Sequence, residues 1–263
     1  MTALIAPEWS LLDRVALGWF LLTWLGYGPF IQRLRSARSI TARLRGVRRA
    51  WMHAMLGRDN RITDASLIGH AMHSATFFAS TTMVALAALL GMLGMLGMLG
   101  NMDRTHGAVE ALAFTAKTPR PVVEGKVLLL LLVFAHTFLK LTWAIRQLNY
   151  GVALIGAAPS KPGPALRDAA ADRTAAVLSL ALGSFNAGVR GYYFALAALA
   201  WLVGPGAFAL ATTGMVAMLL WRQFGSDTAE AIRLSHRVLA VEAPDTSDGG
   251  EEIGRGLVAQ GLA

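Results

Sequence analysis

Long apolar segments alternate with short polar ones along most of this chain. A helix needs about 20 apolar residues to span the hydrocarbon core of a bilayer, and segments of that length lie at residues 11–31, 66–100 and 122–143. A further apolar stretch, Gly191–Trp221, contains no charged residue and is interrupted by Gly204-Pro205-Gly206. We expect two spans there, at about 186–203 and 206–222, rather than one long broken helix. The pattern predicts an all-α integral membrane protein with about five transmembrane helices.

The segment after the first span is different, because arginines alternate with apolar residues at helical spacing. We expect Gly28-Pro29 to kink or end the first span, and a basic amphipathic helix to follow over about residues 33–58. Its cationic face holds seven arginines: Arg33, Arg35, Arg38, Arg43, Arg45, Arg48 and Arg49. Such helices lie in the membrane surface, so we expect these arginines to bind the head groups of anionic lipids.

A polar turn separates this basic helix from the second span. Its polar side chains are Asp59, Asn60, Arg61 and Asp64. We expect Asp64 to cap the next helix. The group forms either a salt-bridge network with Arg146 or Arg190, which would lock the cytoplasmic side, or a simple turn and cap. We favour a structural network over a catalytic one, because two aspartates in a turn are a weak catalytic signal.

The distribution of basic residues among the connections predicts the orientation. Lys and Arg number nine in 32–65, three in 101–121, five in 146–190, none in 204–206 and four from 222 onward. Cytoplasmic connections are enriched in Lys and Arg. The alternation therefore places the N-terminus outside and the C-terminus in the cytoplasm of a cell (inner) membrane protein; four spans would replace five if residues 204–206 were not a turn. We expect a transmembrane domain over 1–225 and a cytoplasmic tail over 226–263, amphipathic at first and largely disordered.

Composition agrees with a membrane protein and narrows the chemistry. Hydrophobic residues make up 55% of the chain and charged residues 15%, against about 25% charged residues in a typical soluble domain. The net charge of +8, beside such apolar segments, favours anionic lipid over nucleic acid as a partner. The absence of cysteine excludes disulfides, zinc–thiolate sites, iron–sulfur clusters and thiol nucleophiles. No glycine-rich phosphate loop, GxSxG, HExxH or DxD motif occurs, so we do not expect an enzyme.

Several cations are candidates for an anion or ligand site near the cytoplasmic side. Lys140 is the deepest expected charge, about 9 Å along a helix before Arg146, and no acidic residue occurs between residues 125 and 165. Asn186, Arg190 and Tyr193 share one helix face. The alternatives are structural: Lys140 could extend its ammonium to the head groups, and Arg146 and Arg190 could be ordinary flanking charges.

Three histidines, His70, His73 and His136, raise the possibility of haem or another metal centre. On the expected topology His73 and His136 lie at similar depths, which makes them weak candidate ligands. His70 and His73 have no carboxylate beside them, and haem needs two facing ligands. Polar residues at helix contacts are the better interpretation, and we predict no metal site and no cofactor.

Motifs spread along the chain resemble one membrane family. They are Gly57-Arg-Asp-Asn-Arg-Ile62 with Asp64, Phe77-Phe-Ala-Ser80, Phe138-Leu-Lys-Leu-Thr-Trp143, Arg146-Gln-Leu-Asn-Tyr150, Ile155-Gly-Ala-Ala158 and Phe185-Asn-Ala-Gly-Val-Arg-Gly-Tyr-Tyr-Phe194. Over about residues 10–225 the chain resembles domain of unknown function family 599, which occurs in bacteria and plants. The last motif is the most specific. The resemblance implies a small polytopic membrane protein and no particular activity.

Three classes of function remain open. The leading hypothesis is a homo-oligomeric channel or transporter that passes or senses an anion near Lys140 and Arg190. The second is a non-enzymatic scaffold that binds anionic lipid and a partner protein through residues 32–58. The third is a haem- or quinone-linked redox protein that uses the histidines.

Overall fold

The computed structural model describes residues 9–33, 40–99, 120–159 and 163–241, and these residues are helical with no strand among them. The all-α expectation is therefore confirmed for this part of the chain. The elements are α1 (Leu11–Arg33), α2 (Ile40–Leu56), α3 (Ile62–Leu99), α5 (Arg120–Ala157), α6 (Pro164–Leu199), the 3₁₀ turn η2 (Ala200–Leu202), α7 (Pro205–Phe224) and α8 (Asp227–Val241).

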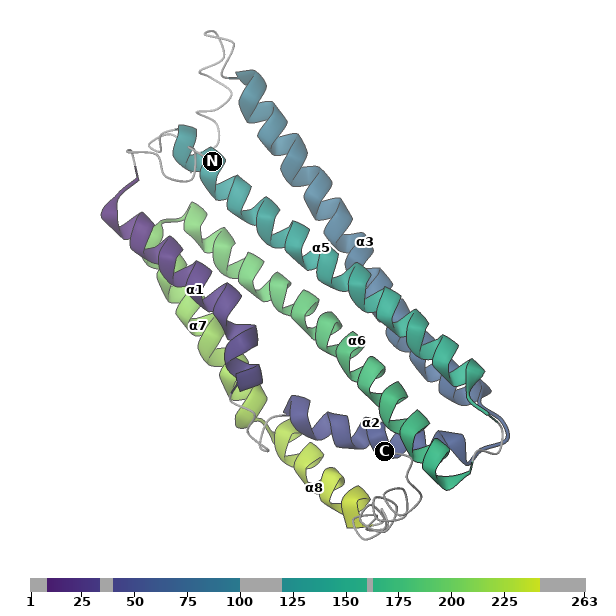
Figure 1. Cartoon of the computed structure of the whole chain (residues 1–263). Helices are drawn as coiled ribbons and strands as arrows, with labels where there is room; N and C mark the ends of the chain where they lie inside the picture. Colours follow the sequence, from purple (N-terminus) through teal and green to yellow (C-terminus); the bar gives the residue numbers. More distant parts are fainter. Residues whose placement is uncertain (1–8, 34–39, 100–119, 160–162, 242–263) are drawn as a thin grey trace, which may run out of the picture.

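The long helices α1, α3, α5, α6 and α7 lie side by side and alternate in direction (Figure 1). The helix α5 packs between α3 and α6, and α1 packs mainly against α7, which also contacts α6. The shorter helices α2 and α8 lie across one end of the bundle, where α1 ends and α3 begins. We call this the α2 end, and we call the end with the α6–α7 turn the opposite end.

Glycines allow α5 and α6 to approach closely. A Cβ at Gly188 would lie 2.6 Å from Leu141 Cδ2, and a Cβ at Gly191 would overlap Thr137 Oγ1. Small residues have this role in packed membrane helices, where backbone approach increases van der Waals contact. The α5–α6 pair is therefore the closely packed centre of the bundle.

Two apolar clusters form the core. One joins α1, α5, α6 and α7 around aromatic rings: the centroid of Phe20 lies 5.8 Å from that of Phe194 and 5.1 Å from that of Phe208. The other joins α2 to α3, α5 and α6 and contains Met52 and Leu178. The apolar face of α2 is thus used for packing against the bundle.

The outer surfaces of the long helices are also apolar. Two helical segments, Ile62–Leu96 and Pro121–Ala157, are long and apolar enough to cross a membrane. In the best apolar window of the first, 11% of the residues are buried, against 50% in the second. Exposed large apolar side chains include Leu22 on α1, Phe77 on α3 and Leu210 on α7.

Several expected boundaries need correction. Pro29 lies inside α1, which continues to Arg33, because a proline in the last turn removes only one helical hydrogen bond. The helix α5 does not end near residue 143 but continues to Ala157. The backbone N–H of Ile62 donates to Asn60 Oδ1 over 2.9 Å, so Asn60 rather than Asp64 caps the start of α3.

The regions around α2 and α8 also differ from expectation. The basic helix is described over Ile40–Leu56, Arg33 belongs to α1 instead, and residues 34–39 lie outside the described residues. The expected turn at residues 204–206 is present, since α7 begins at Pro205 and runs back beside α6. The tail was expected to be largely disordered, but its amphipathic first part forms α8, which packs against α2. Residues 242–263 lie outside the described residues.

Candidate functional site

Two arginines and two tyrosines meet between α1, α6 and α7. The guanidinium carbon of Arg190 lies 5.5 Å from the centroid of the Tyr27 ring. Arg222 Nη1 donates a hydrogen bond of 2.7 Å to the Tyr193 hydroxyl, and the Arg222 guanidinium lies 5.6 Å from the centroid of that ring. The charges of both arginines also act on the Tyr27 hydroxyl. Tyr27 is buried, Arg190 and Tyr193 are half-buried, and Arg222 is exposed where the cluster reaches the surface. We call these four residues the interior cationic cluster.

Long side chains connect α1 to α5 and α6 around the cluster. Because α1 packs mainly against α7, aromatic side chains span the distance from α1 to α5 and α6. Trp24, one turn before Tyr27, reaches the His136 ring on α5 at a centroid distance of 5.4 Å. A Cβ at Gly28 would lie 3.9 Å from Arg190 Nη2, so the α1 backbone passes close to the guanidinium.

The interior cationic cluster lacks a balancing negative charge among the described residues. The salt bridges in this part of the chain join Arg49 or His53 to aspartates of α6, and Arg58 to Asp64. No carboxylate of the described residues lies within 4.0 Å of Arg190 or Arg222. Aromatic faces stabilise a guanidinium without neutralising it, so the cluster keeps its positive charge.

The structure brings some of the predicted site residues together and separates others. Arg190 and Tyr193 belong to the interior cationic cluster. Lys140 lies at the same depth on α5, since its neighbour Leu141 packs against Gly188, and its charge acts on His136. Asn186 is exposed one turn before Arg190.

Arg146 lies apart from the cluster, and two members of the cluster were missed by sequence reasoning. Arg146 is exposed and donates to the Tyr150 hydroxyl over 3.1 Å, one turn along its own helix. Tyr27 and Arg222 were missed because their meeting depends on how α1 and α7 pack. Arg222 offered one signal, as the first charge after an uncharged stretch.

The polar turn before α3 is held by contacts within the α2 end. Asp64 is fully buried and its Oδ1 accepts hydrogen bonds from Trp51 Nε1 at 2.7 Å and Arg58 Nη1 at 2.8 Å. Arg61 Nη1 donates to Ala158 O over 2.6 Å, at the C-terminus of α5. The aspartate thus pairs with Arg58, not with Arg146 or Arg190, and Asp59 is exposed.

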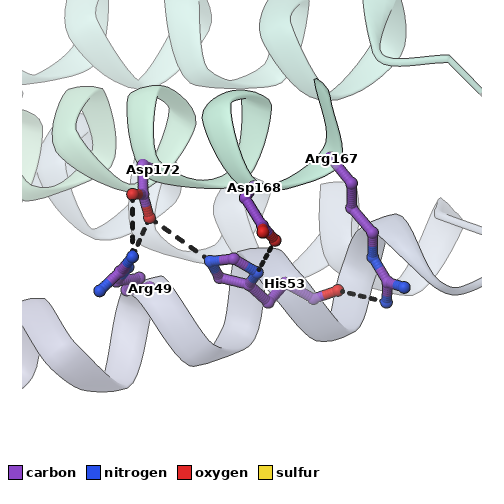
Figure 2. A network of polar contacts seen from close by, with 5 residues as sticks. All are labelled: Arg49, His53, Arg167, Asp168 and Asp172. Atoms are coloured by element: carbon purple, nitrogen blue, oxygen red, sulfur yellow. Dashed lines mark hydrogen bonds and ion pairs between the residues drawn. The ribbon is translucent and has the colours of Figure 1, made fainter. Parts of the chain in front are cut away.

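A second polar network joins α2 to the first turns of α6 (Figure 2). Arg49 pairs with both carboxylate oxygens of Asp172, at 2.5 and 3.0 Å. The His53 ring lies between two aspartates, with Nδ1 3.3 Å from Asp168 Oδ1 and Nε2 3.4 Å from Asp172 Oδ1. Arg167 donates to the His53 carbonyl over 3.2 Å. We call these five residues the α2–α6 junction.

Some of the arginines expected to face lipid face protein instead. Arg48 is buried, donates through Nε to Ser179 Oγ over 2.9 Å, and has its pKa lowered to about 10 by burial and by the nearby charge of Arg45. Burial alone would raise the pKa of Asp172, but hydrogen bonds and attraction from Arg49 and His53 lower it overall. Arg33 and Arg45 are exposed, whereas Arg35 and Arg38 lie outside the described residues.

The histidines do not form a metal centre in the described part of the chain. No group of three or more His, Asp, Glu or Cys residues there could hold a metal ion. His70 and His73 are exposed on α3. His136 faces Trp24 of α1 instead, so the described contacts do not bring His73 and His136 together as a haem pair.

These observations define an all-helical protein that has, among its described residues, two helices apolar enough to cross a membrane. Residues 15–228 match the family described as "Protein of unknown function, DUF599". The chain belongs to this family, which confirms the resemblance seen in its motifs. No curated protein and no solved structure matches the chain.

Proposed function

We propose that the chain is a five-span protein of the cell (inner) membrane, with its N-terminus outside and its C-terminus in the cytoplasm. The alternating directions of α1, α3, α5, α6 and α7 support this topology. Their exposed apolar side chains support it as well, because soluble monomers rarely expose apolar surface on this scale. The α2 end would face the cytoplasm, since the basic segments 32–65 and 146–190 lie at or toward it.

Within this bundle we propose a non-enzymatic role in binding and passing an anion. The observation that carries the proposal is the pair Arg190 and Arg222, which face aromatic rings and have no carboxylate within 4.0 Å among the described residues. Guanidinium groups donate planar pairs of hydrogen bonds that suit oxyanions. Arg190 is half-buried, so its attraction for an anion exceeds that of a fully hydrated guanidinium, whereas Arg222 is exposed.

The aromatic core supports a transporter over a permanently open channel. Phe20, Phe194 and Phe208 are fully or almost fully buried and lie between the interior cationic cluster and the opposite end. Apolar constrictions oppose the passage of ions. An anion bound from the α2 end would therefore need a movement of α1 or α7 to leave at the other end.

Anion binding and flux test this proposal. The protein would be reconstituted at matched incorporation, and chloride, nitrate and small carboxylates would be offered. Arg190→Gln should weaken binding and flux about 10- to 100-fold, the value of one or two hydrogen bonds to a charged group; Lys140→Gln should do so less. Arg146→Gln is the matched control, because Arg146 is exposed outside the cluster. No anion binding and no flux above empty liposomes would reject the proposal.

We further propose that the protein is homo-oligomeric. The support is α3, whose exterior is largely uncovered in the monomer, with 11% of its apolar window buried. Cross-linking through single cysteines on α3 in native membranes, with cysteines on exposed positions of α7 as controls, would test it. Cross-links formed equally at both helices would argue against a defined interface.

A scaffold that binds anionic lipid is the second candidate. The exposed Arg33 and Arg45 support it, whereas Arg48 and Arg49 already have protein partners. Contact of spin-labelled anionic lipid with the full-length protein should fall in Arg45→Gln and at high salt. Equal contact with neutral and anionic lipid would remove this candidate.

A further inference from the structure

The α2–α6 junction contains a histidine that has a carboxylate at each of its two ring nitrogens (Figure 2). His53 Nδ1 lies 3.3 Å from Asp168 Oδ1, and His53 Nε2 lies 3.4 Å from Asp172 Oδ1. The two aspartates are four residues apart, so they share one face of α6. Histidine is the side chain that ordinarily changes its charge between pH 5 and 8. The contacts of α2 with α6 at this point therefore depend on whether the ring is protonated.

Only the protonated ring of His53 suits both carboxylates. An imidazolium donates from both nitrogens, whereas a neutral imidazole has one N–H and one nitrogen lone pair. In either neutral tautomer a lone pair faces a carboxylate oxygen. Asp172 would keep its pairing with Arg49, but Asp168 has His53 as its only ion-pair partner among the described residues. Loss of the proton therefore removes at least one ion pair between α2 and α6.

The other charged groups at the junction do not replace the charge of His53. Arg49 is already paired with Asp172, and Arg167 donates to the His53 carbonyl rather than to an aspartate. On α3, Asp64 accepts from Arg58 and does not contact the histidine. The ring of His53 is thus the titratable cation between α2 and this face of α6 in the described part of the chain.

The helices α7 and α8 also pack on α2, but their described charges lie elsewhere. Arg222 of α7 donates to a tyrosine hydroxyl of α6. Gln223 donates to Thr41 at the start of α2, about 18 Å along the helix from residue 53. Asp227 and Glu230 are exposed in the first turn of α8, which begins at that end of α2. These groups therefore do not set the charge around the histidine.

The attraction across the junction also acts on the aspartate. Burial tends to raise the pKa of Asp172, whereas the hydrogen bonds and charges of Arg49 and His53 lower it overall. Attraction between opposite charges is mutual, so a protonated His53 and a docked α2 stabilise each other. This stabilisation is present at low pH and is lost as the pH rises and the ring gives up its proton.

We propose that the α2–α6 junction is a pH-sensitive latch, which protonated His53 holds closed between α2 and the first turns of α6. The latch can exchange protons with solvent, because the side chain of His53 is 30% exposed and that of Asp168 is 48% exposed. Its energy is accordingly small, and the buried Met52 and Met55 keep α2 on the bundle in both states. Loss of the proton therefore increases local opening of the C-terminal half of α2 and does not detach the helix.

Hydrogen exchange of the full-length protein in nanodiscs tests the latch. After correction for the intrinsic pH dependence of amide exchange, the opening constant of segment 51–56 should rise about 2- to 5-fold from pH 6 to pH 8, the size expected for an exposed charge pair. Aspartates are ordinarily charged throughout this range. His53→Gln should remove the rise and keep the opening constant near the wild-type value at pH 8. His73→Gln is the matched control, because His73 is exposed on α3, and it should keep the rise.

Two more variants keep the test decisive if His53→Gln does not fold. Asp168→Asn removes the carboxylate that has no other ion-pair partner, so the rise should become smaller. His53→Lys keeps a cation at both pH values, so its opening constant should be the same at each. An opening constant of wild type that is equal at pH 6 and pH 8, or an unchanged rise in any of these variants, would overturn the latch. No anion is added in this experiment, so either result leaves the proposed function intact.

Discussion

Replacing Gly191 by alanine should destabilise the bundle, because this glycine lets α5 and α6 approach. An added Cβ would overlap Thr137 Oγ1 and lie 2.9 Å from Thr137 Cβ. The threonine cannot easily move aside: it is fully buried, and its hydroxyl donates to the Val133 carbonyl over 2.8 Å. The helices must therefore separate or the side chain must leave its preferred rotamer.

The size of the effect follows from two opposing contributions. Overpacking a buried contact costs about 1–3 kcal/mol. Replacing glycine by alanine inside a helix gains about 0.5–1 kcal/mol. The net expectation is a loss of about 0–2.5 kcal/mol in the free energy of unfolding, from the difference of those two ranges. Gly183→Ala is the matched control on the same helix, since nothing lies within 4 Å of its added Cβ, and it should gain stability.

Two further variants should have stabilities between those of Gly191→Ala and Gly183→Ala. At Gly151 an added Cβ would meet Leu178 Cδ2 at 2.6 Å, but that atom ends a flexible side chain, so Gly151→Ala should lie between the other two. Thr137→Ala in the Gly191→Ala protein removes the hydroxyl and methyl groups and should restore part of the loss. Stability would be measured by circular dichroism during unfolding in mixed micelles of increasing SDS content. Equal stability of Gly191→Ala and Gly183→Ala would refute the close α5–α6 contact.

The other predictions concern the membrane topology and the α2 end. Because the chain has no cysteine, single cysteines can report topology by labelling: we expect labelling from outside at residue 110 and from the cytoplasm at residues 50, 160 and 240. Arg49→Gln should raise the pKa of Asp172. Because the pKa of Asp172 is lower in the folded protein, its carboxylate stabilises the fold at a pH above its unfolded pKa of about 4. This stabilisation is lost as the pH falls through the pKa of Asp172 in the folded protein. Arg49 and Asp172 are both exposed. The change in the free energy of unfolding between pH 7 and pH 3 should therefore differ between Arg49→Gln and wild type by less than about 1 kcal/mol. Asp64→Ala should cost about 1–3 kcal/mol by leaving two donors unpaired, whereas the exposed Asp59→Ala should change stability by less than about 0.5 kcal/mol in thermal unfolding.

Apolar length and turn residues were sufficient to predict most of the helices. The uncharged stretch with Gly204-Pro205-Gly206 correctly indicated two antiparallel helices, because proline suits the first turn of α7 and cannot lie inside a continuous helix without disrupting it. The predicted helix ends were wrong where packing stabilises a helix beyond its apolar segment. The C-terminal part of α5 continues through Arg146 to Ala157 because Leu148 and Ile155 pack on α2, α3 and α6, and Arg61 binds its terminal carbonyls.

The amphipathic pattern of α2 does not show whether its apolar face contacts lipid or protein. Helical spacing predicts which residues share a face, but the same apolar face can bind lipid or protein. In the structure Met52 and Met55 pack against the bundle, so the face is already covered. Asp172 lies more than a hundred residues after Arg49, and only the folded chain shows that it pairs with one of the expected lipid-binding arginines.

The depth of a charge in the bundle also depends on distant residues. Lys126 lies near the start of an apolar segment, a position typical of an interfacial charge, whereas Lys140 lies further inside. The structure reverses this order of burial: Lys126 is 7% exposed because η2 brings Trp201 over it from a point 75 residues later in the chain. Sequence position along a helix therefore locates a charge relative to the membrane but does not show which charges the neighbouring helices cover.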